Sequence, residues 1–366
     1  MNMKKSIIGL SRNQIGELLL SLGVSEKNLK MRISQIFHSI YFKGSKKIDE
    51  ITTISKKLRE DLNQSYSLER NKIKKEVVSK DKTRKWLLSL QDDKEIETVF
   101  IPEKKRGSLC ISSQVGCTLN CSFCHTGTMP LVRNLTAFEI MSQVLLAKDE
   151  LDDWEGNSDI RKLTNIILMG MGEPLYNYEE VSKAIKIIID SEGINISKRK
   201  VTLSTAGIVP MIERLGEELD VGLAISLHAV NDDIRNTLVP INRKYPIKEL
   251  IAALKKYTEA KSSRKITFEY VMLKNVNDSI SDARELCRII SGIPAKINLI
   301  PFNPWPLSIY ECSDEKKIRA FSEVITRAGY SSPVRKPRGR DIMAACGQLV
   351  SQSKRTSRHD QGGINV

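Results

Sequence analysis

Residues 116–125 read Gly-Cys-Thr-Leu-Asn-Cys-Ser-Phe-Cys-His, which places Cys117, Cys121 and Cys124 in a CxxxCxxC pattern. The apolar run Leu109-Cys110-Ile111 comes shortly before and is typical of the end of a strand. Three thiolates on one loop form a soft ligand set. Because there are three rather than four, they would leave one iron of a [4Fe–4S] cube without a protein ligand. The stretch therefore predicts a redox cluster with one open iron.

A zinc knuckle and a set of inert buried thiols are the two other interpretations of these cysteines. Structural zinc takes four Cys or His ligands, and only His125 lies near enough in the sequence to be the fourth. The spacing differs from that of ferredoxins. It is similar to that of the radical S-adenosylmethionine (SAM) enzymes, in which SAM binds the open iron and is cleaved by an electron. We therefore favour the cluster.

The size and composition of the chain predict one large domain and a smaller one. The chain has 366 residues, of which 40% are hydrophobic and 28% charged, and this length allows a large buried core. No apolar run approaches the roughly 20 residues that cross a membrane, and the one near the N-terminus is too short for a signal peptide. Seven cysteines without an export signal predict a reducing, cytoplasmic location. We expect no membrane contact, and nothing requires more than a monomer.

Positive charge is concentrated at the two ends of the sequence, within a net charge of +14. Residues 1–100 carry 21 Lys and Arg against 13 Asp and Glu, and residues 331–366 carry 7 against 2. Residues 101–330 are almost neutral, with 30 against 29. Basic ends around a neutral body favour a polyanionic partner such as nucleic acid. A generally Lys-rich surface is the alternative explanation.

The predicted elements divide the chain into four parts. Residues 1–95 show helical patterns at 11–22, 31–41 and 54–66, with a hairpin-like pair at 84–90 and 97–102 leading onward, and form a predicted helical RNA-binding accessory domain. Residues 96–330 form the core domain. Residues 331–350 form a Gly-, Pro- and Arg-rich segment that carries Cys346, and residues 351–366 form a polar tail that we expect to be disordered.

Strands and helices alternate in the core domain. Such an order predicts an α/β fold with a parallel sheet, here an open, partial (β/α)6 barrel. In barrels of this kind function lies at the carboxyl ends of the strands, and the distinctive residues of this chain follow the predicted strands. The strands are expected at 108–115, 165–169, 199–204, 222–227, 267–272 and 296–300, and the helices at 137–150, 178–191, 208–218, 247–260, 280–291 and 314–328.

Polar residues that could bind a ligand follow four of these strands. The turn Gly170-Met171-Gly172-Glu173-Pro174 allows a close approach of the backbone to a ligand, and Glu173 could accept a hydrogen bond from an ammonium group such as that of SAM. Hydroxyl, imidazole and amide groups at the other strand ends could bind carboxylate, ribose or adenine edges. Ordinary turn chemistry is the alternative for each. These other groups belong to Ser204, Ser226, His228 and Asn303.

A further thiol, Cys346, lies in the Gly-flanked stretch at residues 339–349. Basic surroundings lower the pKa of a thiol, and a flexible loop makes it accessible, so Cys346 is a candidate reactive thiolate. A small buried hydrophobe is the alternative interpretation.

The motifs together resemble the RlmN family of dual-specificity RNA (adenine-C2)-methyltransferases. They occur in order between residues 97 and 349, without a departure at a motif position, and only the Lys-rich N-terminal part matches loosely. The matching pieces are the stretch 110–117, the cysteine loop, Arg133-Asn134-Leu135-Thr136, the turn at 170–174, Ser226-Leu227-His228, Pro301-Phe302-Asn303-Pro304 and the stretch 341–349.

The resemblance implies a role for each matching residue. Cys117, Cys121 and Cys124 would hold a [4Fe–4S] cluster. Glu97, Cys110 and Cys346 would be catalytic. The SAM contacts would be Gly172, Glu173, Ser204, Ser226, Leu227, His228 and Asn303.

The resemblance also implies a mechanism that consumes two SAM molecules per turnover. C2 of adenine is not nucleophilic, so its methylation needs radical chemistry supplied by cofactors. One SAM would methylate Cys346, and a second, bound on the cluster, would give a 5′-deoxyadenosyl radical that takes a hydrogen from this methyl group. The carbon radical would add to C2, with Glu97 as general base. Cys110 would then attack the sulfur of Cys346, which releases the RNA and leaves a transient disulfide.

The implied substrates are adenosine 2503 of 23S rRNA and adenosine 37 of some tRNAs, with a flavodoxin or ferredoxin system as the electron donor. One alternative is a sister group that methylates C8 of adenine in rRNA and confers antibiotic resistance. It shares the two-cysteine design, so the motifs discriminate poorly between the two. The other alternative is a non-catalytic RNA-binding protein with an Fe–S sensor, which would have no use for Glu173 or for a second thiol.

Overall fold

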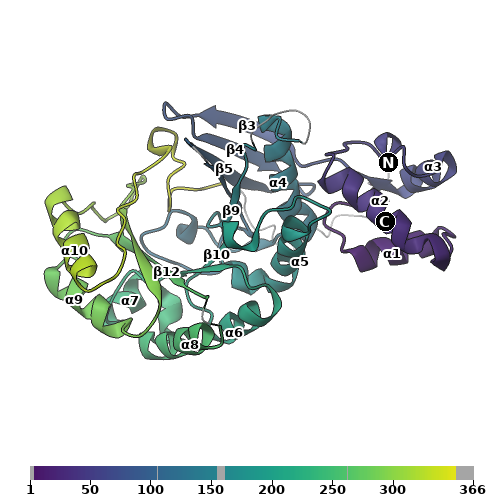
Figure 1. The fold of residues 1–366 in the computed structure, drawn as a ribbon. Coiled ribbons are helices and arrows are strands. Elements are labelled where there is room, and N and C mark those ends of the chain that lie inside the picture. The colour runs from purple at the N-terminus through teal and green to yellow at the C-terminus, as the bar shows by residue number, and fades with distance from the viewer. Residues whose placement is uncertain (1–3, 105, 155–160, 262, 352–366) are drawn as a thin grey trace, which may run out of the picture.

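A curved sheet of nine strands is the centre of the molecule (Figure 1). The computed structural model describes residues 4–104, 106–154, 161–261 and 263–351. Six neighbouring strands run parallel, and three more continue the sheet in antiparallel fashion beyond the first of them. In spatial order the parallel strands are β13 (Ala295–Pro301), β12 (Ile266–Met272), β11 (Gly222–Ser226), β10 (Val201–Thr205), β9 (Asn165–Leu168) and β6 (Arg106–Cys110), and the antiparallel strands are β5 (Glu95–Glu103), β4 (Arg84–Ser89) and β3 (Lys72–Val78).

Helices lie on the outer side of this sheet (Figure 1). Apolar side chains at helical spacing, such as Val144 and Leu254, are fully buried against the strands. Thr136 and Ser279 begin two of the helices with capping boxes. The predicted α/β fold with six parallel strands is thereby confirmed. The helices are α4 (Ala137–Leu151), α5 (Tyr178–Ile189), α6 (Val209–Glu218), α7 (Asp232–Leu238), α8 (Ile247–Glu259), α9 (Ile280–Ile289) and α10 (Glu315–Arg327).

Two details of the barrel differ from the sequence prediction. Helix α7 was not expected, because seven residues are too few to show an apolar period; it begins where the Asn231 side chain accepts a hydrogen bond from the N–H of Ile234. The single strand expected at 108–115 is divided. Its second half is β7 (Gln114–Val115), which leaves the main sheet and pairs with β8 (Arg133–Asn134). The other expected strands and helices agree within a few residues; α8, for example, spans Ile247–Glu259.

The accessory helices form a group beside α4 and α5 (Figure 1). They are α1 (Arg12–Ser21), α2 (Glu26–Tyr41) and α3 (Lys56–Ser65), and the short strands β1 (Lys5–Ser6) and β2 (Tyr66–Ser67) pair at their two ends. Arg12 reaches Asp190, after α5, with an N–O distance of 2.8 Å. Phe37 and Tyr41 of α2 are buried in the same apolar core as the barrel. The accessory helices therefore pack directly on the barrel.

The sheet continues into the region that was assigned to the accessory domain by sequence. Strands β3 and β4 lie before residue 95, yet β4 pairs with β5 along its whole length. A boundary at residue 95 would cut this ladder, so the helical part ends at Ser65, before these strands. The pattern hid β3 because its exposed positions include Lys72, Lys74 and Lys75, charged side chains that protect the edge of a sheet from pairing with another chain.

The segment at residues 331–351 links the two edges of the sheet, and Figure 1 shows it in yellow between α10 and the antiparallel strands. At one end Val334 bridges to Leu299 of β13. At the other, Asp341 accepts a hydrogen bond of 2.6 Å from the hydroxyl of Ser79, in the turn between β3 and β4. Apart from Ser351, the predicted polar tail lies outside the described residues. Within the described ranges, no helix has the length and apolar character to cross a membrane.

Candidate active site

The loop with the three cysteines is closed at its base by the pairing of β7 with β8. Gly116 follows β7 with φ of 78°, and a Cβ at this position would lie 2.1 Å from the carbonyl oxygen of Pro130. Only glycine allows the two ends of the loop to approach this closely. The base therefore fixes the loop in place at the carboxyl end of β6, as the sequence predicted for a site of this fold.

The three thiols of the loop line one cavity. Each is half-buried, and burial raises the pKa of Cys117 to about 12 and also raises those of Cys121 and Cys124. Such thiols ionise only beside a positive charge, which the iron of a cluster provides. The N–H of Leu119 already points at the sulfur of Cys117, at 3.4 Å, and hydrogen bonds to sulfur are a feature of Fe–S sites.

This arrangement fits a cluster better than a single metal ion. Within the described ranges, no three or more His, Cys, Asp or Glu side chains are grouped so that they could hold one ion. Thiolates of a cubane bind different irons, so they need to face one cavity rather than one point. The donor set of Cys117, Cys121 and Cys124 meets that requirement.

The cavity lies at the carboxyl ends of the parallel strands and contains about 980 Å³ of space free of protein atoms. It brings together residues from the ends of five strands, the cysteine loop and the C-terminal segment. Among the predicted site residues, its lining includes Cys117, Cys121, Cys124, Gly172, Glu173, Ser204, Ser226, His228, Asn303 and Cys346.

Glu173 is held in the cavity wall by backbone N–H groups. Its two carboxylate oxygens accept hydrogen bonds from the N–H of Leu175, at 3.0 Å, and from that of Ala206, at 2.8 Å. Gly172 lets this turn pass the cysteine loop, because a Cβ there would lie 2.5 Å from Cβ of Gln114. Burial raises the pKa of Glu173 to about 7. A cationic group in the cavity would favour its ionised form.

His228 is a buried histidine in a left-handed backbone conformation, with φ of 60°. Such a φ is uncommon for a residue other than glycine, although histidine adopts it more often than most residues. Its Nδ1 accepts a hydrogen bond of 3.1 Å from the N–H of Val271, and burial lowers its pKa to about 3. The ring is therefore neutral, and Nε2 carries the proton as a hydrogen-bond donor.

The remaining predicted SAM contacts occupy different positions. The amide of Asn303 donates a hydrogen bond of 3.1 Å to the carbonyl oxygen of Cys346 and accepts one from Arg340. Ser204 and Ser226 line the cavity. The side chain of Leu227 does not, because it is fully buried in the apolar core. Leu227 can therefore contact a ligand only through its backbone.

The two other cysteines with predicted roles lie within electrostatic reach of each other. Cys110 ends β6 and is buried, and both burial and a negative charge on Cys346 raise its pKa. Cys346 is exposed and lines the cavity, and desolvation by the surrounding protein raises its pKa as well. Arg335 opposes these shifts, because its positive charge lowers the pKa of both thiols. Both thiols are free in this structure.

Glu97, the predicted base, lies in β5 next to the C-terminal segment and outside the cavity lining. One of its oxygens pairs with Lys85 at 2.8 Å, and the other accepts a hydrogen bond of 2.9 Å from the N–H of Val350. Burial raises its pKa despite the lysine. A raised pKa suits a general base that works near neutral pH.

Comparison with known proteins decides the family. A family model described as "Radical SAM superfamily" matches residues 111–287. The dual-specificity RNA methyltransferase RlmN of Bradyrhizobium diazoefficiens is 57% identical over 365 residues, which cover 98% of this chain and 91% of that protein. The RlmN protein of Rhizobium meliloti is 56% identical and covers 98% of this chain, with 90% of its own length matched. The chain belongs to the RlmN family.

A solved structure of a radical SAM methyltransferase from Sphaerobacter thermophilus has the same fold, with a TM-score of 0.87 at 42% identity. The match covers 94% of this chain and 99% of that one. The predicted resemblance to RlmN and the predicted radical SAM fold are both confirmed. Use of an Fe–S cluster and of SAM follows from membership of the radical SAM superfamily.

Three buried or half-buried charges that shape this RlmN-family site were missed from the sequence. Arg235 of α7 is fully buried and donates to the carbonyl oxygens that follow β10 and β11. Glu269 of β12 lines the cavity, and Arg335 pairs with it. The sequence signals for these residues are weak: Glu269 is a single charge within an apolar strand, Arg335 lies in a basic stretch, and Arg235 lies in a short polar helix without an apolar period.

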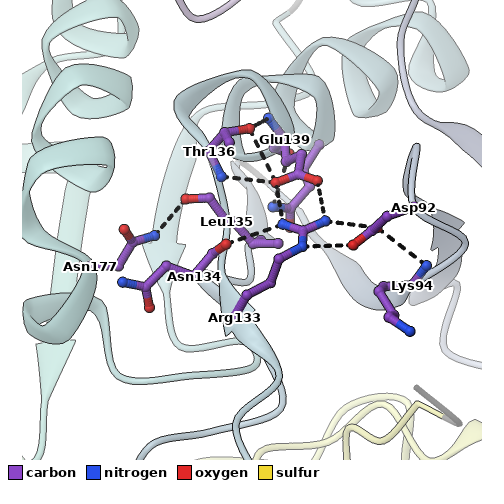
Figure 2. A network of polar contacts seen from close by, with 9 residues as sticks. Asp92, Lys94, Arg133, Asn134, Leu135, Thr136, Glu139 and Asn177 are labelled. Carbon is purple, nitrogen blue, oxygen red and sulfur yellow. Dashed lines mark hydrogen bonds and ion pairs between the residues drawn. The ribbon is translucent and has the colours of Figure 1, made fainter. Parts of the chain in front are cut away.

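The RlmN-family motif at residues 133–136 begins in β8, at the base of the cysteine loop. Its polar contacts, shown in Figure 2, form a clamp between separate elements. Arg133 donates two hydrogen bonds to Asp92, both of 2.8 Å, and two to Glu139 of α4, of 2.9 and 2.7 Å. Thr136 caps α4, and the carbonyl oxygen of Leu135 accepts a hydrogen bond from Asn177 (Figure 2). The motif therefore ties the base of the loop to the β4–β5 turn and to α4.

Replacing Arg133 with methionine should lower the free energy of unfolding by about 1–2 kcal/mol, because buried Glu139 loses its bidentate partner. Arg133→Lys should recover less than half of the lost free energy of unfolding, because an ammonium group cannot form two bidentate pairs with carboxylates. Urea unfolding of the purified proteins measures both. Arg214→Met is the matched control, because Arg214 also bridges two glutamates but on the surface, and we expect no measurable change. Equal destabilisation of the two methionine variants would contradict the clamp.

Proposed function

We propose that the protein methylates C2 of adenosine 2503 in 23S rRNA and of adenosine 37 in some tRNAs, as a cytoplasmic monomer. The observation that carries this proposal is the position of Cys346 in the same cavity as the three loop cysteines, with the thiol of Cys110 in electrostatic reach. Two thiols in addition to those of the cluster site are useful when the protein itself carries the methyl group. The dual-specificity names of the relatives supply the two RNA classes.

The cavity would hold both cofactors. Cys117, Cys121 and Cys124 would bind the [4Fe–4S] cluster, and the SAM contacts would come from the strand ends, with two SAM molecules used per turnover. With an electron from a flavodoxin or ferredoxin, the bound cluster supplies reductive cleavage of SAM to a 5′-deoxyadenosyl radical. The N–H groups of Leu175 and Ala206 orient the Glu173 carboxylate for the ammonium group of SAM. Neutral His228 presents Nε2–H as a donor.

Cys346 would carry the methyl carbon. Arg335 favours its thiolate, the form that attacks a sulfonium methyl group. Glu97 would take the proton from C2 of adenine. Because Glu97 is buried behind the C-terminal segment and lies outside the cavity lining, this role requires the chain after Cys346 to shift when RNA binds. Cys110 would finally attack the sulfur of Cys346, and the bond from that sulfur to the methylene carbon would break.

The accessory helices would hold the RNA backbone. Their surface is rich in exposed ammonium groups, which neutralise phosphates and release counterions. Replacing four of these lysines with glutamine should make RNA binding less salt-dependent, with the slope of log K against log salt reduced by up to about one unit for each phosphate that is no longer neutralised. Filter binding at several salt concentrations measures this, and an unchanged slope would contradict the role. The exposed lysines are Lys27, Lys30, Lys43, Lys46, Lys47, Lys56 and Lys57.

SAM binding should weaken as the pH falls below about 7, the pKa to which burial raises Glu173. In the empty cavity the carboxyl group is protonated below this pH, and the ammonium group of SAM requires the charged form. Between pH 7.5 and 6 we expect the dissociation constant of SAM to rise about tenfold. Equilibrium dialysis with the cluster-loaded protein measures it. Glu173→Gln should bind SAM weakly at both pH values, and the same tenfold change in this variant would assign the titration to another group.

Mass spectrometry of nucleosides from treated RNA tests the proposed function directly. Purified, reduced protein is incubated with SAM and with either a 23S rRNA fragment or tRNA. We expect 2-methyladenosine from both. Formation of 8-methyladenosine would move the protein to the sister activity, and the absence of any methylated adenosine while SAM is cleaved would refute both.

A further inference from the structure

Glu269 is a buried carboxylate with one oxygen bound and one free. It lies in β12, directly opposite Asn298 of β13, and only 3% of its surface is exposed. Its Oε1 accepts a hydrogen bond of 2.7 Å from the Asn298 amide, and Arg335 lies 3.4 Å from the same oxygen. Its Oε2 has no hydrogen-bond partner among the described residues. The two neighbours therefore fix the carboxylate and leave Oε2 without a donor.

A buried carboxylate oxygen without a donor is costly, and in native proteins such an oxygen commonly has a functional role or binds a water, an ion or a ligand. Glu269 lines the cavity at the carboxyl ends of the strands. The missing partner can therefore be supplied by a molecule bound there. Because a carboxylate only accepts hydrogen bonds, that molecule must present an N–H or O–H group to Oε2.

The two buried carboxylates of the cavity belong to different parts of its wall. Glu173 is joined to the cysteine loop, because its N–H donates to Gln114, whose Oε1 also accepts from the N–H of Thr118. Glu269 is joined through Arg335 to the C-terminal segment that carries Cys346. Both Glu269 and Cys346 line the same cavity. Glu269 thus lies in the wall of the cavity that also contains the thiol proposed to carry the methyl group.

We propose that Oε2 of Glu269 accepts a hydrogen bond from the exocyclic amino group of the target adenine. This inference rests on the proposed function. The amino group is the only hydrogen-bond donor on adenine in a nucleotide, whereas guanine has a carbonyl acceptor at the same position. A fixed carboxylate would attract the first and repel the second. Glu269 is therefore a specificity-determining residue, distinct from the SAM contacts at Glu173.

A comparison of two RNAs and two proteins tests this hydrogen bond. One RNA carries adenosine at the target position, and the other carries purine riboside, which lacks only the amino group. Wild-type protein should methylate the purine RNA with a kcat/KM lower by on the order of 10- to 100-fold, the effect of losing one charge-assisted hydrogen bond. Glu269→Gln should already show this loss with adenosine, because Asn298 and Arg335 hold the amide oxygen and turn the amide NH2 toward the base.

The decisive quantity is the ratio of the two rates within each protein. An altered intrinsic reactivity of purine would affect both proteins equally, so only the hydrogen bond to Glu269 makes the ratio differ between them. We expect a large ratio for the wild type and a ratio near one for Glu269→Gln. Equal ratios would overturn the proposal. Glu269→Asp, which keeps the charge but withdraws the oxygen, should give an intermediate ratio and serves if the glutamine variant fails to fold.

Methylation of Cys346 in the absence of RNA separates recognition of adenine from SAM binding. Peptide mass spectrometry should show that Glu269→Gln methylates Cys346 with an unchanged KM for SAM, whereas Glu173→Gln does not. A KM for SAM raised tenfold or more in Glu269→Gln would assign Oε2 to SAM instead and overturn the proposal. If the wild type gives no 2-methyladenosine from adenosine RNA, the proposed function itself fails, and this inference fails with it.

Discussion

RNA should become covalently attached to the protein when Cys110 is replaced with alanine. In the proposed reaction the Cys110 thiolate attacks the sulfur of Cys346, the bond from this sulfur to the methylene carbon breaks, and its electron pair passes to that carbon, which gains a proton. Without the attacking thiol, Cys346 stays bonded through the methylene carbon to C2 of adenine. Each protein molecule should then react about once and stop. A denaturing gel detects the adduct, and mass spectrometry of the digested adduct locates both ends of the bond.

The controls for this experiment come from the same chain. Cys287→Ala removes a half-buried thiol of α9, and it should turn over without an adduct. Cys110→Ala combined with Cys346→Ala should give neither product nor adduct. Attachment at C8 would identify the sister activity. If Cys110→Ala forms no adduct while the wild type methylates RNA, Cys346 is not the methyl carrier, and only the cluster assignment remains.

Replacing Arg235 with methionine should cause a large loss of stability. Its guanidinium is fully buried and donates to the carbonyl oxygens of Ala206, Ser226 and Leu227, at 2.7 to 3.1 Å, and to the side chain of Asn242. The methionine variant leaves these buried acceptors without a donor. Because each unpaired buried acceptor has its own cost, we expect the free energy of unfolding to fall by about 3–5 kcal/mol. Urea unfolding measures this change.

The same substitution should also weaken retention of the cluster. The positive charge of Arg235 lowers the pKa of Cys121 and so favours the thiolate that binds iron. Iron content after reconstitution should therefore fall in Arg235→Met. Arg235→Lys should recover more of the iron content than of the free energy of unfolding, because lysine restores the positive charge but not the forked set of hydrogen-bond donors. Arg288→Met, at an exposed pair on α9, should change neither quantity. Normal stability in Arg235→Met would show that the carbonyl oxygens find other donors.

The barrel could be predicted because its signals are local. Each strand is a short apolar run, each helix has an apolar period, and the cysteine pattern occupies eight consecutive positions. The structure confirms the six parallel strands and gathers most of the predicted site residues around one cavity. Leu227 is the exception among the predicted SAM contacts, because its side chain, one residue beyond the end of β11, packs into the core.

The missed residues depend on interactions between distant parts of the chain. In the sequence, Glu269 is one charge inside an apolar strand. Its role depends on the hydrogen bond from Asn298 and on Arg335, which is 66 positions further along. Arg235 lies on a helix too short to show a period. The hydrogen bond from the N–H of Val350 to Glu97 joins residues that are 253 positions apart. No local pattern encodes such neighbours, because they are created only when the sheet and the C-terminal segment come together.

The C-terminal segment also fixes the order in which the protein acquires its chemistry during translation. The ribosome makes residues 331–351 after every strand of the sheet, and the Cys346 thiol enters the cavity wall only when this segment spans from β13 to the turn after β3. Until this segment is in place, the cysteine loop lacks the hydrogen bonds that join His125 and Thr126 to Gly347 and Leu349. The loop and the thiol that faces the same cavity therefore reach their final positions together, only after the segment has been made.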